Sequence, residues 1–161
     1  MGITLNADEI FEIAEQIERN GAKFYRAAAK KFSVVRQVLL DLAAQEDEHL
    51  KIFQDMRAQL TSRQQQPDVF DPDGQAQMYL QAMADGHIFD IKADPAEKLA
   101  GIQNAEDVLK SAVGIERDSI AYYVGLREYV PVRAGRDKVE DIIKEEMRHI
   151  AVLNEKLAAL K

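Results

Sequence analysis

The sequence predicts an all-α protein, a bundle of four long helices, and three observations predict it. Good helix formers such as Ala, Leu, Glu and Lys fill long stretches in which apolar residues recur at steps of three and four. The chain has only four prolines and eight glycines, and most of them fall between residues 67 and 101 or near 131–135. Residues typical of helix N-caps stand where the periodic stretches begin.

We expect the first helix to begin after Asn6 and to end near Lys31. Asn6 with Glu9 three residues later is a capping box, which satisfies the free N–H groups at a helix start. The inward ridge of this helix consists of apolar or small residues at helical spacing. One member of the ridge, Glu18, is charged.

We expect Ser33 to cap a second helix that reaches about Leu60. Its ridge is apolar at helical spacing except for two polar residues near the middle, Glu46 and His49. The off-ridge neighbours Asp47, Glu48 and Glu145 are expected to be solvated.

Residues 61–103 change character and read as a long connection. Within it a short helix is predicted over about 75–84, and Asp94 before Pro95 can start one more helical turn. His87 is interpreted as a loop or cap residue. A connection of this length can carry the chain from one end of the bundle to the other, which would leave the second and third helices parallel.

The third helix is expected to begin after Asn104, with Asp107 as its capping partner, and to end near Val130. Its ridge is apolar or small at helical spacing except for Glu116, Ser119 and a tyrosine two turns after Glu116. As in the first helix, one carboxylate stands near the middle.

The fourth helix follows a break at Pro131 and Gly135. Asp137–Glu140 is predicted to be its capping box. Its apolar ridge carries Glu146 and His149, so both halves of the chain show a helix with one Glu followed by a helix with Glu-x-x-His. This internal repeat indicates a pseudo-two-fold axis through a shared central site.

Six polar side chains are therefore predicted to converge in the core. They are Glu18, Glu46, His49, Glu116, Glu146 and His149. Burying an isolated carboxylate costs several kcal/mol, and four close together would repel one another. Two divalent cations would cancel four negative charges, and two neutral imidazoles would complete the shell. Oxygen-rich ligation with one imidazole per metal suits Fe(II) or Mn(II).

At these residues the sequence resembles the rubrerythrin branch of the ferritin-like superfamily, whose fold is an antiparallel four-helix bundle with a long crossover between helices 2 and 3. The resembling stretches are 18–25, 42–49, 116–123 and 143–149. The resemblance implies one domain over residues 1–161 with two iron ions, Mn or a mixed-metal site being the alternative. It implies Glu46 and Glu146 as bridging ligands, His49 and His149 each serving one metal, and a reaction of the reduced iron with peroxide or dioxygen.

Two departures from that family refine the expectation. The chain has no cysteine, so it lacks the four-cysteine rubredoxin domain, and electrons would come from a separate donor such as a rubredoxin-type protein. The position where rubrerythrins carry an extra glutamate is Ser119 here, which favours a simpler ferroxidase or oxidase-like site over peroxidase activity. Iron storage of the bacterioferritin kind and a non-catalytic helical interaction module remain the alternatives.

Tyr25 and Tyr123 each follow a candidate ligand by two helical turns. Packing in the core is their expected role, and the alternative is a hydrogen bond to a ligand or radical quenching.

Composition excludes several other classes of function. A net charge of −7 argues against a nucleic-acid partner, which needs a basic face. No signal peptide or membrane span is recognised in the sequence, so a cytoplasmic location is expected. The family resemblance implies a homodimer.

Overall fold

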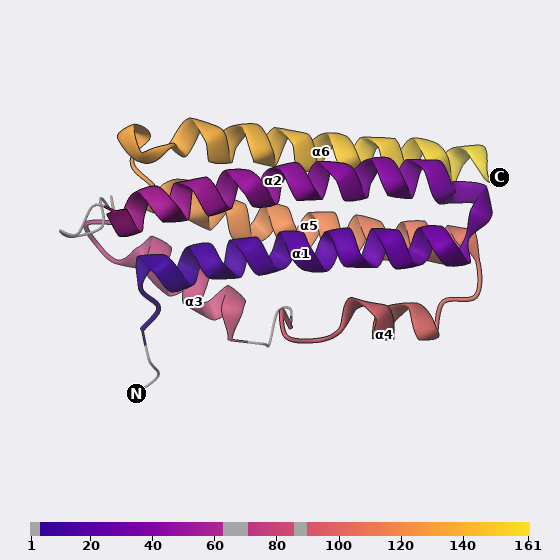
Figure 1. Cartoon of the computed structure of the whole chain (residues 1–161), viewed down its shortest axis with the longest axis horizontal. Helices are drawn as coiled ribbons and strands as arrows, with labels where there is room; N and C mark the ends of the chain where they lie inside the picture. Colours follow the sequence, from indigo (N-terminus) through magenta and orange to yellow (C-terminus); the bar gives the residue numbers. More distant parts are fainter. Residues whose placement is uncertain (1–3, 63–70, 86–89) are drawn as a thin grey trace.

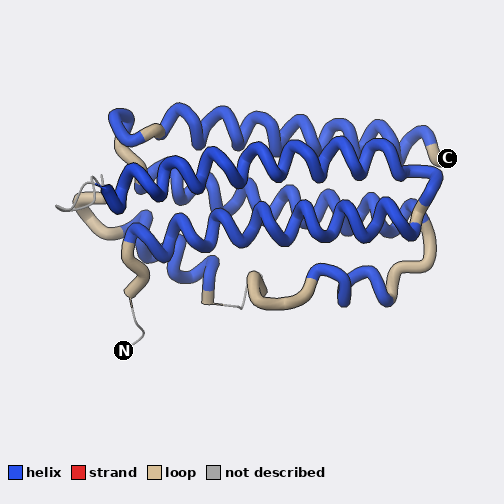
Figure 2. Tube along the Cα trace, viewed as in Figure 1, coloured by secondary structure: helices blue, strands red, loops and turns tan. Residues whose placement is uncertain are grey.

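Four long helices run side by side along the molecule in the computed structural model, which describes residues 4–62, 71–85 and 90–161 (Figure 1). Their bounds are Ala7–Lys31 (α1), Arg36–Ser62 (α2), Ala105–Tyr129 (α5) and Arg136–Ala159 (α6). Helices make up most of the described chain, and the loops lie at the ends of the bundle and along one side of it (Figure 2). The predicted all-α four-helix bundle is confirmed.

The helices form two antiparallel hairpins, α1 with α2 and α5 with α6 (Figure 1). The connection between the hairpins leaves α2 at one end of the bundle and enters α5 at the other, so α2 and α5 run parallel and the predicted long crossover is confirmed. The crossover contains α3 (Gln75–Ala84), which packs on α5, and α4 (Pro95–Ala100), which packs on α1. His87 lies outside the described residues.

Three of the predicted caps are present. The Asn6 side chain accepts from the Glu9 N–H at 2.9 Å, and the Glu9 carboxylate accepts from the Asn6 N–H at 2.8 Å. Asn104 accepts from the N–H of Asp107 at 2.8 Å at the start of α5. Asp94 accepts from Ala96 N–H at 3.0 Å at the start of α4. These bonds satisfy N–H groups that have no partner inside their own helix.

The predicted cap at Ser33 is wrong. The link after α1 is so short that Ser33–Val35 form a single 3₁₀ turn, η1, which continues directly into α2. The carbonyl of Ser33 accepts from the N–H of Arg36, and no side chain caps this turn. The guanidinium of Arg36 donates to the carbonyl of Ala29 at 3.2 Å instead, at the end of α1.

The predicted capping box at Asp137–Glu140 is also wrong, because α6 begins earlier. A 3₁₀ turn, η2 (Val132–Ala134), leads to Gly135 at φ 105°. This left-handed conformation favours glycine. The helix then starts at Arg136 without a side-chain cap, which leaves Asp137 inside the first turn.

The core divides into two apolar clusters along the bundle. One contains the first half of α1, the second half of α2 and the second half of α5, and it includes Phe53 and Tyr122. The other contains the opposite halves of the same helices, with Phe24 and Leu39. The level between these clusters is where the six polar ridge residues lie, so apolar side chains pack on both sides of them.

Two glycines inside α5 provide a matched test of how α3 packs. A Cβ at Gly125 would lie 2.4 Å from Tyr79 Cδ1 and 3.0 Å from Leu80 Cδ2, whereas the nearest atom to one at Gly114 is 4.0 Å away. We expect Gly114→Ala to raise the free energy of unfolding by about 1 kcal/mol through helix propensity. We expect Gly125→Ala to lower it by about 1–3 kcal/mol, because overpacking outweighs that gain. Urea denaturation measures both, and equal stabilisation of the two variants would refute close packing of α3 on α5.

Candidate metal centre

The six polar ridge residues meet at one level of the bundle interior. Each is at most 2% exposed. Helices α1 and α5 contribute Glu18 and Glu116, and α2 and α6 each contribute a Glu and a His one turn apart. The helical ridges place these residues near the middle of each helix, far from solvent at either end.

The six side chains form two overlapping groups that could each hold a metal ion. The first group is Glu18, Glu46, His49 and Glu146, and the second is Glu46, Glu116, Glu146 and His149. Within each group, one ligand atom from every residue lies within 4.8 Å of the others. Glu46 and Glu146 belong to both groups, which is the arrangement that two bridging carboxylates require.

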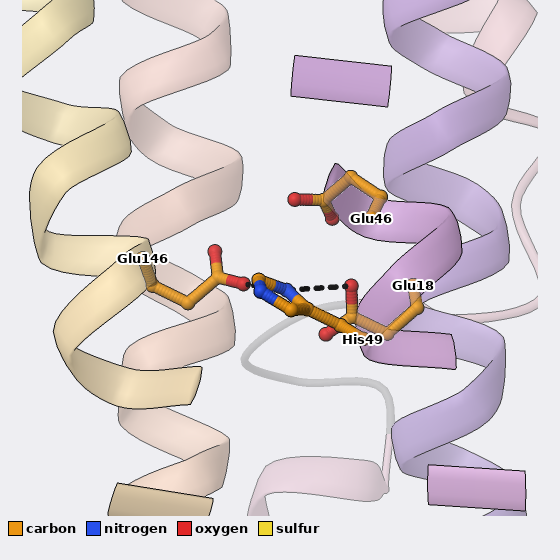
Figure 3. Close-up of side chains that lie close together, drawn as sticks. All are labelled: Glu18, Glu46, His49 and Glu146. Atoms are coloured by element: carbon orange, nitrogen blue, oxygen red, sulfur yellow. Dashed lines mark ion pairs between the residues drawn. The ribbon is translucent and has the colours of Figure 1, made fainter. Parts of the chain in front are cut away.

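Both histidines turn the same ring nitrogen inward. His49 Nδ1 lies 2.8 Å from Glu146 Oε1 and 3.5 Å from Glu18 Oε2, between carboxylates from opposite sides of the bundle (Figure 3). His149 Nδ1 lies 3.2 Å from Glu116 Oε2. The two imidazole rings stack with centroids 5.7 Å apart.

The outward nitrogens are held by residues that the sequence analysis missed. His49 Nε2 lies 2.6 Å from Glu145 Oε2, and His149 Nε2 lies 3.0 Å from Gln45 Oε1. Such partners fix the ring orientation and leave Nδ1 available as a ligand atom. The side chain of Glu145 is 37% exposed, so it is partly solvated as expected, and its contact with His49 was not predicted. Gln45 and Glu145 each directly precede the Glu of a Glu-x-x-His motif, which is a signal that the repeat contained.

The two tyrosines that follow the ligand glutamates bridge the hairpins. The hydroxyl of Tyr25 donates to Glu116, and that of Tyr123 donates to Glu18. Both tyrosines are fully buried. Each therefore packs in the core and also fixes one oxygen of a carboxylate on the opposite hairpin.

Several buried atoms in the cluster have no hydrogen-bond partner. They are Glu18 Oε2, Glu46 Oε1, both carboxylate oxygens of Glu146, and His49 Nδ1. His49 Nδ1 is near enough to Glu146 for an ion pair, but the contact lacks the alignment of a hydrogen bond. Since buried polar atoms without partners are rare in folded proteins, these five atoms fit a site that a cation completes.

Two small residues allow the helices to approach the cluster. Gly21 lies one turn after Glu18, and a Cβ added there would be 2.5 Å from Glu46 Oε2. Ser119 lies one turn after Glu116 and is 2% exposed, with its hydroxyl donating to the carbonyl of Ile115. Gly21 is needed because Glu46 lies against the α1 backbone.

The fold and site together define a four-helix bundle with an interior carboxylate–histidine cluster. The sequence matches the Ferritin-like domain family over residues 6–159, and the chain belongs to that family. It is similar to the crystal structure of a proposed ferritin-like diiron-carboxylate protein from Thermotoga maritima, with 24% identity, a TM-score of 0.71 and complete coverage of both chains. No curated protein matches the chain significantly. Within the described residues, no helix is both long enough and apolar enough to cross a membrane.

Burial and mutual repulsion govern protonation in the cluster. Burial raises the pKa of Glu18 to about 7, opposed by the nearby ring of His49. Burial and neighbouring carboxylates also raise the pKa of Glu46 well above its usual range. Burial alone would lower the pKa of His49, but Glu146 and Glu18 raise it to about 11. The metal-free cluster thus holds protons at neutral pH that balance part of its negative charge.

These shifts set the pH dependence of the metal-free protein. A carboxyl with a raised pKa binds a proton in the folded state that it releases in the unfolded state, so its contribution to stability is lost as pH rises. For Glu18 this window extends from the ordinary value of 4.5 to about 7. His49 adds a loss that begins near 6.5 and extends to about 11. Burial would raise the pKa of Glu146, but the neighbouring Glu116, His149 and His49 lower it below its usual value, so its opposite effect acts only below 4.5.

We therefore expect the thermal unfolding midpoint of the metal-free protein to decrease as the pH is raised from 5 to 8. Glu46→Gln, which removes one buried titrating group, should weaken this dependence. Glu48→Gln on the exposed face of α2 is the matched control and should leave it unchanged. Calorimetry after exhaustive chelation measures the three proteins, and a midpoint that rises steadily from pH 5 to pH 8 would contradict the assignment.

Proposed function

We propose that the chain is a di-iron oxidoreductase whose six ridge residues hold two iron ions. The observation that carries the proposal is the pair of overlapping ligand groups that share Glu46 and Glu146, with five buried ligand atoms lacking hydrogen-bond partners. Manganese is the alternative metal, because the same oxygen-rich donor set suits it. When bound, the two ions would supply electrons to dioxygen or peroxide.

In this proposal the side chains hold the two ions, orient the ligands and exclude water. Glu18 and Glu116 are terminal carboxylates, each with one oxygen fixed by a tyrosine from the opposite hairpin. The second group also contains His149, whose Nδ1 faces the cluster as that of His49 does. Apolar clusters on both sides exclude bulk water, which strengthens electrostatic interactions inside the site. Metal binding would displace the protons that the metal-free cluster holds.

Composition supports a separate source of electrons. The chain has no cysteine and so no thiolate-held redox centre. We propose that a separate donor protein of the rubredoxin type reduces the iron. Ser119 replaces the extra carboxylate of rubrerythrins, which supports oxidation of Fe(II) by dioxygen or peroxide over efficient peroxide turnover.

The proposal predicts an iron stoichiometry and how single changes alter it. Anaerobic titration with Fe(II) should saturate at two ions per chain. Glu146→Gln, which alters a ligand of both groups, should abolish or severely weaken both sites, whereas Glu18→Gln should leave one. Glu48→Gln, which removes an exposed charge from α2, serves as the control. A wild-type stoichiometry near zero for both Fe(II) and Mn(II) would refute the metal centre.

The two metal positions should also differ in affinity. The carboxylate of Glu145 lies closer to its histidine than the amide of Gln45 does to the other, and charged hydrogen bonds are the stronger kind. We expect Glu145→Gln to weaken binding at the His49 position by about tenfold or more. Glu155→Gln removes the same charge from an exposed site on α6 and should have no such effect. Anaerobic calorimetric titration with Mn(II) resolves the two steps, and identical curves for wild type and Glu145→Gln would contradict this role.

A further inference from the structure

A pocket of about 60 Å³ lies next to the cluster on the face that the crossover covers. Its inner lining comes from α1 and α5, and its outer lining from the crossover segment that includes α4. With the bundle seen from the side, this segment lies against α1, on the side away from α2 and α6 (Figure 1). The pocket is separate from the six ridge residues, none of which lines it.

The floor of the pocket includes two small residues from the helices that carry Glu18 and Glu116. Gly21 and Ser119 both line it, and both are one helical turn after a cluster glutamate. Gly21 has no side chain to separate the pocket from Glu46. The two are so close that a Cβ added at Gly21 would lie 2.5 Å from Glu46 Oε2. Gly21 thus lies beside both the pocket and Glu46 of the cluster.

The walls are mostly apolar and are held in place. Ile17, Ile91 and Ile115 line the pocket. The side chain of Asn20 donates to the carbonyl of Ile91 at 2.9 Å, and Lys23 pairs with Asp94 at 2.9 Å. These two contacts tether the crossover to α1 and keep the outer wall over the floor.

The lining carries charges of both signs. Asp90 and Lys98 come from the crossover and Asp118 from α5. The charges of Arg117 and Lys98 act on Asp118, so the acidic groups there are partly balanced. Stripping water from a cation in a mostly apolar pocket is costly, which favours an uncharged occupant.

We propose that this pocket is the site where the oxidant, a small uncharged molecule such as dioxygen or hydrogen peroxide, docks before it reaches the cluster. This rests on the proposed function. A single water molecule needs about 10–15 Å³ of cavity volume. The volume of about 60 Å³ therefore suits a molecule of a few heavy atoms. Pockets for organic ligands begin at roughly 300 Å³, which excludes a larger substrate here.

The first test uses xenon as an apolar probe of the metal-free protein. Xenon enters apolar cavities, so crystals of wild type pressurised with xenon should show anomalous density between Ile17 and Ile115. Ala93→Phe, which places a ring at another lining position, should abolish that density. Ala96→Phe, at an exposed crossover position outside the lining, is the matched control and should retain it.

The second test measures oxidation in the iron-loaded protein. Ala93→Phe should lower the second-order rate constant for oxidation by dioxygen or peroxide about tenfold or more, because entry would then need the crossover to move. Its Fe(II) stoichiometry and rate of Fe(II) uptake should equal those of Ala96→Phe. If Ala93→Phe does not fold, Ser119→Val narrows the floor instead and should have the same effects.

Each outcome is decisive. Absence of xenon from the wild-type pocket, or an oxidation rate unchanged by filling it, overturns the proposal. Slower Fe(II) uptake with unchanged oxidation also overturns it and identifies a cation route. Failure of the wild type to bind iron would defeat the proposed function instead, and the xenon result would still decide whether the pocket accepts a molecule of dioxygen size.

Discussion

Four carboxylates buried at one level of a helical bundle are the constraint on which the rest of this structure depends. Taking a single ionised carboxylate out of water costs several kcal/mol even after the protein relaxes, and mutual repulsion adds to that cost. The metal-free protein reduces the charge by raising the pKa of Glu18, Glu46 and Glu116 and by keeping its histidines protonated. Bound protons compensate the buried charge only in part, because buried oxygens of three glutamates still lack hydrogen-bond partners. Cations that satisfy those oxygens would stabilise the folded state by binding it selectively.

Neither helical hairpin contains a complete site. Tyr25 on the first hairpin fixes Glu116 on the second, and Tyr123 on the second fixes Glu18 on the first. The outer partners of the histidines cross between hairpins in the same way, from α6 to α2 and from α2 to α6. Four of the six candidate ligands are therefore held in place by a residue of the opposite hairpin, so the cluster is complete only when the two hairpins are packed together. The long crossover makes this possible by bringing α2 and α5 into parallel alignment.

The sequence predicted the interior of this protein better than its turns, for physical reasons. Glu18 and Glu116 were recognisable because a charged residue on an apolar ridge breaks a pattern with a fixed period. The predicted capping roles of Ser33 and Asp137 were wrong because a short 3₁₀ turn forms at each of the two junctions. The sequence alone does not show which of several local hydrogen-bond patterns will form at such a junction. Glu145 was missed because its contact crosses between helices. The closeness of Gly21 to Glu46 likewise depends on helix separation, which the ridge pattern does not encode.

The four glutamates share one rule that separates the two faces of the bundle. In α2 and α6 the residue three positions after the glutamate is a histidine, whereas in α1 and α5 it is Gly21 or Ser119. Residues at this spacing lie on the same face of a helix. The α2–α6 side therefore fills the space beside each carboxylate with a ligand held from outside by Glu145 or Gln45. On the α1–α5 side the corresponding positions carry small residues. The pocket lies beside them, under the crossover. One spacing thus gives the cluster a rigid side that orients ligands and an opposite side that small molecules could approach.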